Sequence, residues 1–181
     1  MLIMNKISAF LLTVFLGLYF SVAAQIDVYQ DDIISLLNCN GTIQKYDFEY
    51  EKTLVSLRVR VAAKDTPNSF WEKFREEKKE SIQELISILA FAYRKNYSYP
   101  EIKELLNYCK TSVAQEQLEN EKEVTNEELK IIEVYNTSKI TKTVLAKKEV
   151  LAADIKSIVD EWKRELFVKG LGAMVKAGYT K

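Results

Sequence analysis

Residues 81–108 have the sequence SIQELISILAFAYRKNYSYPEIKELLNY, and this stretch decides the fold. In its first half, apolar residues recur three and four positions apart, which is the spacing of one face of an α-helix. They are Ile82, Leu85, Ile86, Leu89 and Tyr93. Residues 94–97 close this helix, and Ser98 with Pro100 and Glu101 has the pattern of a capping box that starts another. The stretch therefore predicts two amphipathic helices joined by a short turn.

The same helical spacing recurs on both sides of this hairpin. We expect a short helix that begins at residues 31–32 and ends at Gly41, and another that begins near residues 65–68. A second capping box at residues 125–128 opens a further helix, and residues 145–167 are strongly amphipathic. The chain holds only 5 glycines and 2 prolines, too few for the many turns of a sandwich or barrel. The sequence therefore predicts an all-α fold, a small bundle of stacked amphipathic helices and helical hairpins.

Residues 42–63 carry two competing periodicities. Residues 54–61 alternate apolar and polar side chains, which is the spacing of a β-strand. In the first half, Ile43, Tyr46 and Tyr50 are three and four positions apart, which is helical. We predict a helix for the whole segment, because a single strand would find no partner elsewhere in the chain.

Three places weaken the helical pattern. Residues 115–123 are charged and polar, so we expect them to be exposed. A break near residues 136–138 is left open, because small polar residues weaken a helix there. Close to the end, Gly170, Gly172 and Gly178 are expected to loosen the tail.

The first 24 residues have the pattern of a secretory signal peptide. Lys6 gives a positive start, residues 7–20 are almost wholly apolar, and residues 21–24 are small. The apolar run is shorter than the about 20 residues of a membrane-spanning helix. We therefore expect residues 1–24 to be removed after Ala24, no membrane span to remain, and residues 25–181 to form a single helical domain. The protein would be periplasmic or secreted.

The chain holds two cysteines, Cys39 and Cys109. Export would place them in an oxidising compartment, where such a pair predicts a disulfide. Two buried free thiols are the alternative, because the sequence alone does not reveal whether the two Cα atoms lie within bridging distance.

One short motif occurs twice. Residues 101–103, Glu-Ile-Lys, recur as residues 128–130, Glu-Leu-Lys, and Tyr108 has its counterpart in Tyr135. The repeat suggests stacked helical hairpins, although any two amphipathic helices share much of this spacing.

Residues 91–108 contain three features in a row. They are a helix that ends in a tyrosine, a short Lys-aromatic-Ser turn, and a helix that starts with Glu-Ile-Lys. This pattern resembles the bacterial exported helical family catalogued as domain of unknown function 2059. The chain departs from the family at Asn107, where the family has an aromatic residue, and it lacks the family's Pro and Gly after Tyr108. The resemblance implies a helical, periplasmic or secreted protein and implies no reaction. The matching positions are Tyr93, Lys95, Tyr97, Ser98, Glu101, Ile102, Lys103 and Tyr108.

Charge and residue counts argue against several functions. Lys+Arg 26 and Asp+Glu 26 cancel, so no basic excess favours nucleic-acid binding. The absence of histidine excludes Ser-His-Asp and Cys-His nucleophile systems and His-rich zinc sites. No glycine-rich phosphate loop occurs. We therefore expect a non-enzymatic protein with no catalytic residues, cofactor or metal.

Two features bear on binding. Tyr93, Tyr97, Tyr99 and Tyr108 gather around one helix turn, where they either pack in the core with their hydroxyls at the rim or line a binding groove. Residues 166–176 either dock on the bundle or contact a membrane surface peripherally. We expect an interaction or envelope-associated protein with an unknown protein partner. The alternative is a carrier of a lipid or small apolar ligand in a cavity between helices.

Overall fold

The computed structural model describes residues 28–119 and 125–181, and these are helical almost throughout. The expected signal peptide, residues 1–24, lies outside the described residues. The helices are residues 28–39, α2 (Thr42–Arg60), α3 (Asn68–Asn96), α4 (Tyr99–Cys109), α5 (Ser112–Glu119), α6 (Asn126–Thr137) and α7 (Lys139–Ala177). Within this described part, β-structure is limited to an isolated bridge between Ala62 and Thr180. The all-α prediction is confirmed.

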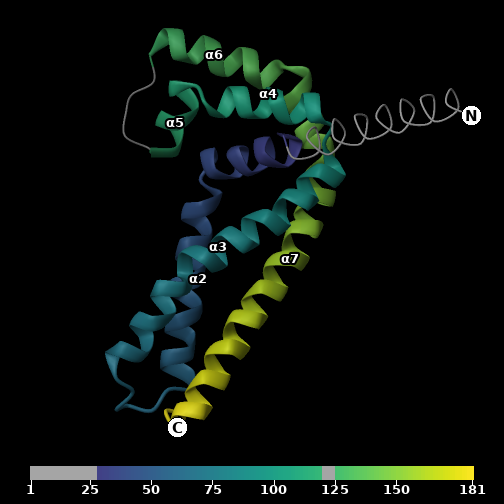
Figure 1. The fold of residues 1–181 in the computed structure, drawn as a ribbon. Helices are drawn as coiled ribbons and strands as arrows, with labels where there is room; N and C mark the ends of the chain where they lie inside the picture. Colours follow the sequence, from purple (N-terminus) through teal and green to yellow (C-terminus); the bar gives the residue numbers. More distant parts are fainter. Residues whose placement is uncertain (1–27, 120–124) are drawn as a thin grey trace, which may run out of the picture.

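Long helices form one part of the bundle and short helices the other (Figure 1). Helices α2, α3 and α7 pack against one another and reach the end where the C terminus lies. The helix of residues 28–39 gathers with α4, α5 and α6 at the opposite end. Helix α7 connects the two parts, because it contacts α4 and α6 as well as α2 and α3. No helix in the described ranges is both long enough and apolar enough to cross a membrane.

Residues 54–61, whose alternation is that of a strand, belong to helix α2 as far as Arg60. Burial along this segment follows the helical period. Leu54 and Leu57 are 3% and 1% exposed, whereas Val55 and Val59 are 58% and 66% exposed. Two valines of the alternating pattern therefore lie on the solvent face of a helix, and the helix prediction is confirmed as far as Arg60. It is wrong for residues 61–63, where Ala62 instead pairs with Thr180 in the isolated bridge.

The predicted helix junctions are found at three places. Gly41, between residues 28–39 and α2, has a φ of 81°, a left-handed conformation that glycine adopts without strain. The Glu101 carboxylate accepts a hydrogen bond from the Ser98 N–H at 2.7 Å, and the Glu128 carboxylate accepts one from the Thr125 N–H at 2.6 Å. Both capping boxes are therefore formed.

The open question at residues 136–138 is answered by a break at Ser138. Its backbone is extended, with φ −67° and ψ 161°, and it separates α6 from α7. The Ser138 side chain accepts a hydrogen bond from the Thr141 N–H at 3.3 Å, so it caps α7.

Two expectations about helix extents are wrong. The first helix already includes residues 28–30, so residues 31–32 lie inside it rather than at its start. It extends further because Tyr29 packs against the core and its hydroxyl donates to the Tyr97 carbonyl. The polar stretch 115–123 is not wholly exposed either, because its first half belongs to α5, where Gln115 is half-buried.

The expectation of a loosened C-terminal tail is also wrong, because α7 continues to Ala177. Leu166 and Met174 are buried, which fixes this part of the helix on the bundle. A Cβ added at Gly170 would overlap Leu57 Cδ1, whereas nothing lies within 4 Å of a Cβ added at Gly172. Gly170 therefore lets α2 and α7 approach closely.

Candidate functional site

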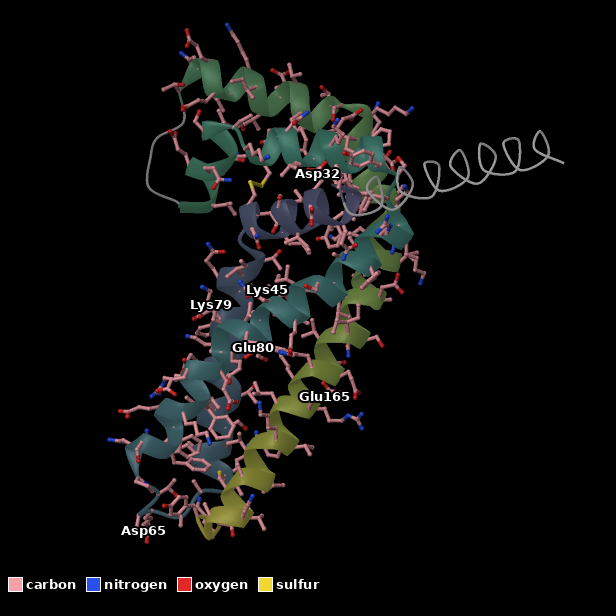
Figure 2. All side chains as sticks on the ribbon, in the orientation of Figure 1. Asp32, Lys45, Asp65, Lys79, Glu80 and Glu165 are labelled. Atoms are coloured by element: carbon pink, nitrogen blue, oxygen red, sulfur yellow. A yellow bond between two sulfur atoms is a disulfide. The ribbon has the colours of Figure 1, made fainter. Side chains whose placement is uncertain are left out.

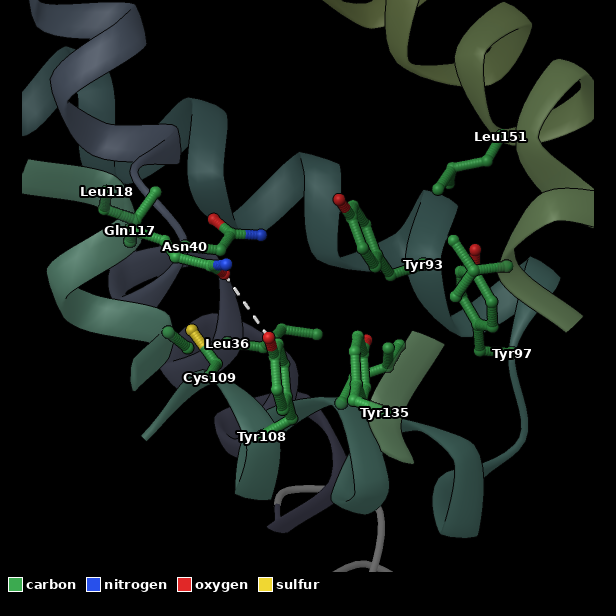
Figure 3. A pocket seen from close by; sticks show the side chains of 13 residues that line it. Leu36, Asn40, Tyr93, Tyr97, Tyr108, Cys109, Gln117, Leu118, Tyr135 and Leu151 are labelled. Carbon is green, nitrogen blue, oxygen red and sulfur yellow. Dashed lines mark hydrogen bonds between the residues drawn. The ribbon is translucent and has the colours of Figure 1, made fainter. Parts of the chain in front are cut away.

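A cleft of about 350 Å³ lies at the end of the bundle where the short helices gather (Figure 3). This volume is at the lower end of the range for small-molecule sites, about 300–1,000 Å³. Residues from every described helix except α2 contribute, and none of the lining side chains is charged. They are Leu36, Asn40, Tyr93, Tyr97, Leu105, Tyr108, Cys109, Ala114, Gln117, Leu118, Tyr135, Val144 and Leu151.

Tyr93 and Tyr97 form one side of the cleft (Figure 3). They are four residues apart at the end of α3, so the helical period places both on one face. Their ring centroids are 6.0 Å apart. The Tyr97 side chain is held further by Lys147, whose Nζ lies 5.1 Å from the centre of the Tyr97 ring.

Tyr108 and Tyr135 form another side of the cleft and stack face to face, with ring centroids 3.4 Å apart and ring planes 1° from parallel. These are the equivalent tyrosines of the repeated motif, so the repeat brings its two aromatic residues together. The rest of the repeat differs in environment, because Ile102 is fully buried and Leu129 is exposed. Tyr93, Tyr97, Tyr108 and Tyr135 are called the cleft tyrosines below.

Burial keeps the hydroxyls of the cleft tyrosines in their neutral form. It raises the pKa of Tyr93 to about 12, and the neighbouring Asn40 side chain opposes this rise. Burial is also the main cause of the raised pKa values of Tyr97, Tyr108 and Tyr135. At neutral pH these groups are therefore hydrogen-bond donors rather than bases.

A disulfide joins Cys39, at the end of the first helix, to Cys109, at the end of α4. The two Cα atoms are 6.1 Å apart, and the predicted bridge is confirmed. The Gln115 Nε2 donates to the Cys39 carbonyl at 3.1 Å and to the Cys109 carbonyl at 2.6 Å. Because Cys109 lines the cleft, the disulfide and Gln115 fix two walls of the cleft relative to each other.

Of the four tyrosines singled out in the sequence, Tyr93, Tyr97 and Tyr108 line this cleft and Tyr99 does not. The Tyr99 hydroxyl instead donates to the Asp32 carboxylate at 3.0 Å, which raises the pKa of Tyr99. Sequence reasoning also missed Tyr135 as a wall residue, although its place in the repeat was a usable signal.

The remaining expectations concern the tail and metal binding. The tail docks on the bundle through Leu166 and Met174, while Val168 and Val175 stay exposed. In the part of the chain that is described, no group of three or more His, Cys, Asp or Glu residues is placed to hold a metal ion.

The chain matches no protein-family model, no curated protein and no solved structure in the comparisons that we made. The resemblance of residues 91–108 to an exported helical family therefore stays a prediction. By its fold, the protein is an all-α bundle, and an uncharged cleft with tyrosine walls lies at one end of it.

Proposed function

We propose that this protein is a non-enzymatic binding protein that holds a small, mainly apolar ligand in the tyrosine-lined cleft. The cleft itself is the observation that carries this proposal. Helical bundles normally fill their interior with side chains to the density of a crystal. Here a cleft of about 350 Å³, partly open to solvent, is left between aromatic and aliphatic walls.

The chemistry of the walls supports binding rather than catalysis. The ionisable side chains that line the cleft are the cleft tyrosines, and Cys109 is held in the disulfide. General acid–base catalysis needs a group with a pKa near the working pH. The pKa values of the tyrosines lie above their usual range, which moves them further from that role.

We also propose that the protein works outside the cytosol, in the periplasm or beyond the cell. The signal-peptide pattern of residues 1–24 and the family resemblance of residues 91–108 support export. The disulfide supports it too, because such bridges persist in oxidising compartments.

Binding can be tested with the neutral fluorescent probe N-phenylnaphthylamine, whose emission rises in apolar surroundings. Val144 lines the cleft, so Val144→Phe should fill part of it. Val150 lies on the same helix, is exposed and does not line the cleft, so Val150→Phe is the matched control. We expect saturable binding to the wild type and to Val150→Phe, and at least about tenfold weaker binding to Val144→Phe.

Two results would reject the proposal. The first is that the wild type does not bind the probe saturably although circular dichroism indicates a folded, helical protein. The second is that Val144→Phe and Val150→Phe bind it with the same affinity, which would place the probe elsewhere on the protein.

A protein partner is the second candidate function, and helix α6 favours it. None of the α6 residues is buried, and Leu129 and Val134 are exposed together with Leu145 at the start of α7. Where such side chains form one contiguous patch, they commonly mark a contact surface. The test is capture of an envelope protein by the wild type and by two variants. Capture of one protein that is abolished by Val134→Asp and kept by Val150→Asp would support this function. Equal capture by both variants would reject it.

A further inference from the structure

The cleft offers no counter-charge to a bound ion. Its lining side chains are uncharged, and Lys147, which lies over the Tyr97 ring, is already paired with Glu101 at 3.1 Å. A charged ligand would lose its water shell in the cleft without gaining an ion pair, which is strongly unfavourable. The walls therefore select an uncharged ligand.

The stacked pair of tyrosines offers a flat surface. One face of the Tyr135 ring is covered by Tyr108, and Figure 3 shows its other face turned toward the side of the cleft that holds Tyr93 and Tyr97. A planar ring can extend this stack, and aromatic pairs gain affinity beyond the burial of their area. A flexible aliphatic chain gains burial alone.

The amide oxygens of Asn40 and Gln117 already accept hydrogen bonds within the protein. The Asn40 Oδ1 accepts hydrogen bonds from the Thr42 N–H at 3.2 Å and from the Thr42 hydroxyl at 2.5 Å. The Gln117 Oε1 accepts one from the Tyr108 hydroxyl at 3.4 Å, as Figure 3 shows.

Several donors remain for a ligand. The neutral hydroxyls of Tyr93, Tyr97 and Tyr135 line the cleft, and each can donate a hydrogen bond. The amide N–H groups of Gln117 are a further donor. Figure 3 shows the Tyr93 hydroxyl turned toward the side of the cleft that holds Asn40 and Gln117, so Tyr93 and Gln117 are the donors that one ligand oxygen can meet together.

We infer that the ligand of this cleft is an uncharged, planar ring compound that carries a hydrogen-bond acceptor oxygen, such as a ketone carbonyl. The ring stacks on Tyr135, and the acceptor oxygen receives hydrogen bonds from Tyr93 and Gln117. This inference rests on the proposed function, because it names the ligand class of the same cleft.

Competition with N-phenylnaphthylamine tests each property separately. Acetylnaphthalene is neutral and carries a carbonyl, ethylnaphthalene lacks the acceptor, and naphthoate has the same rings with a negative charge. A fourth competitor, the methyl ketone of decalin, keeps the carbonyl and loses the planar ring. We expect acetylnaphthalene to bind about 25-fold more tightly than ethylnaphthalene, because each of its two ordinary hydrogen bonds contributes about fivefold. It should bind at least about tenfold more tightly than naphthoate and several-fold more tightly than the decalin ketone.

Two variants test the assigned donors. Tyr93→Phe and Gln117→Leu should each reduce the preference for acetylnaphthalene over ethylnaphthalene and leave the affinity for ethylnaphthalene nearly unchanged. Gln83→Leu is the matched control, because Gln83 is exposed on α3 and does not line the cleft. It should leave all four affinities as in the wild type.

The outcomes separate this inference from the proposed function. If the wild type binds N-phenylnaphthylamine and Val144→Phe weakens that binding, the cleft is a binding site. Three results would then overturn the ligand class alone. They are equal affinities for acetylnaphthalene and naphthoate, equal affinities for acetylnaphthalene and ethylnaphthalene, and equal affinities for the two ketones. If Val144→Phe does not weaken binding of the probe, the proposed function itself is rejected.

Discussion

Removing the disulfide should cost a large part of the stability of the fold. The perturbation is the double substitution Cys39→Ala with Cys109→Ala. The bridge joins residues 70 positions apart, so its loss frees a long loop in the unfolded chain. With a loop of about 70 residues, the chain-entropy relation gives about 15 cal/mol/K, or about 4.4 kcal/mol at 25 °C. This is a large share of the about 5–15 kcal/mol by which domains are usually stable.

Urea unfolding followed by circular dichroism measures this effect. With an m-value of about 2 kcal/mol/M, the double variant should unfold at a midpoint about 2 M lower than the oxidised wild type. Reductant should move the wild type toward the variant and should not move the variant.

The reasoning about the loop is refuted if the double variant loses less than about 1 kcal/mol. It is also refuted if reductant shifts the variant as much as the wild type, because the shift would then have another cause. A smaller loss would mean that the bridge constrains the unfolded chain less than its loop length implies, because residual structure there already keeps the two segments close.

The remaining predictions concern a packing contact and two buried hydroxyls. Gly172→Ala should stabilise the protein by about 0.5–1 kcal/mol relative to the wild type, because nothing lies near the added methyl group. In Gly170→Ala the added methyl group would overlap buried Leu57, so this variant should be about 1–3 kcal/mol less stable than Gly172→Ala. Urea unfolding of the two variants decides this, and equal stabilities would contradict the close contact between α2 and α7. The pKa values of Tyr50 and Tyr93 are raised to about 12. Because the folded values exceed the unfolded ones, their contribution to stability is complete below about pH 10 and is lost as the pH rises toward about 12. Phenolate absorbance of the folded wild type and of Tyr93→Phe is compared near pH 10. A lower absorbance in the variant would mean that Tyr93 already ionises there, which would contradict this prediction.

The helices could be predicted because their signals are local. Helical spacing in residues 81–108 and the two capping boxes depend on neighbours a few positions away, and both boxes are formed. The disulfide could be predicted from the number of cysteines and the expected compartment, although not from geometry. In residues 54–61 the alternating pattern favoured a strand, and helical burial of Leu54 and Leu57 decided against it.

The cleft could be predicted only in part, because its walls come from distant parts of the chain. Tyr93, Tyr97 and Tyr108 drew attention by lying close in sequence, yet Tyr99 beside them turns to Asp32 instead. The stack of Tyr108 on a second tyrosine depends on how α6 folds back, which helical spacing does not determine.

Two further residues were hidden by their sequence surroundings. Gln115 stands in a polar run, so nothing in the sequence marks it as the residue that bonds both cysteine carbonyls. Gly170 looks like a flexible tail glycine, and its role depends wholly on Leu57 of another helix.

The central claim, that the tyrosine-lined cleft binds a neutral ring compound, is tested most directly by nuclear magnetic resonance of tyrosine rings. Acetylnaphthalene would be titrated into protein with labelled tyrosine, and the ring resonances assigned with Tyr→Phe variants. We expect large, saturable shifts for the four cleft tyrosines and none beyond small changes for Tyr46 and Tyr50, which lie in the core between the long helices. Saturable shifts that leave the cleft tyrosines unchanged, or no shifts at all, would contradict the claim.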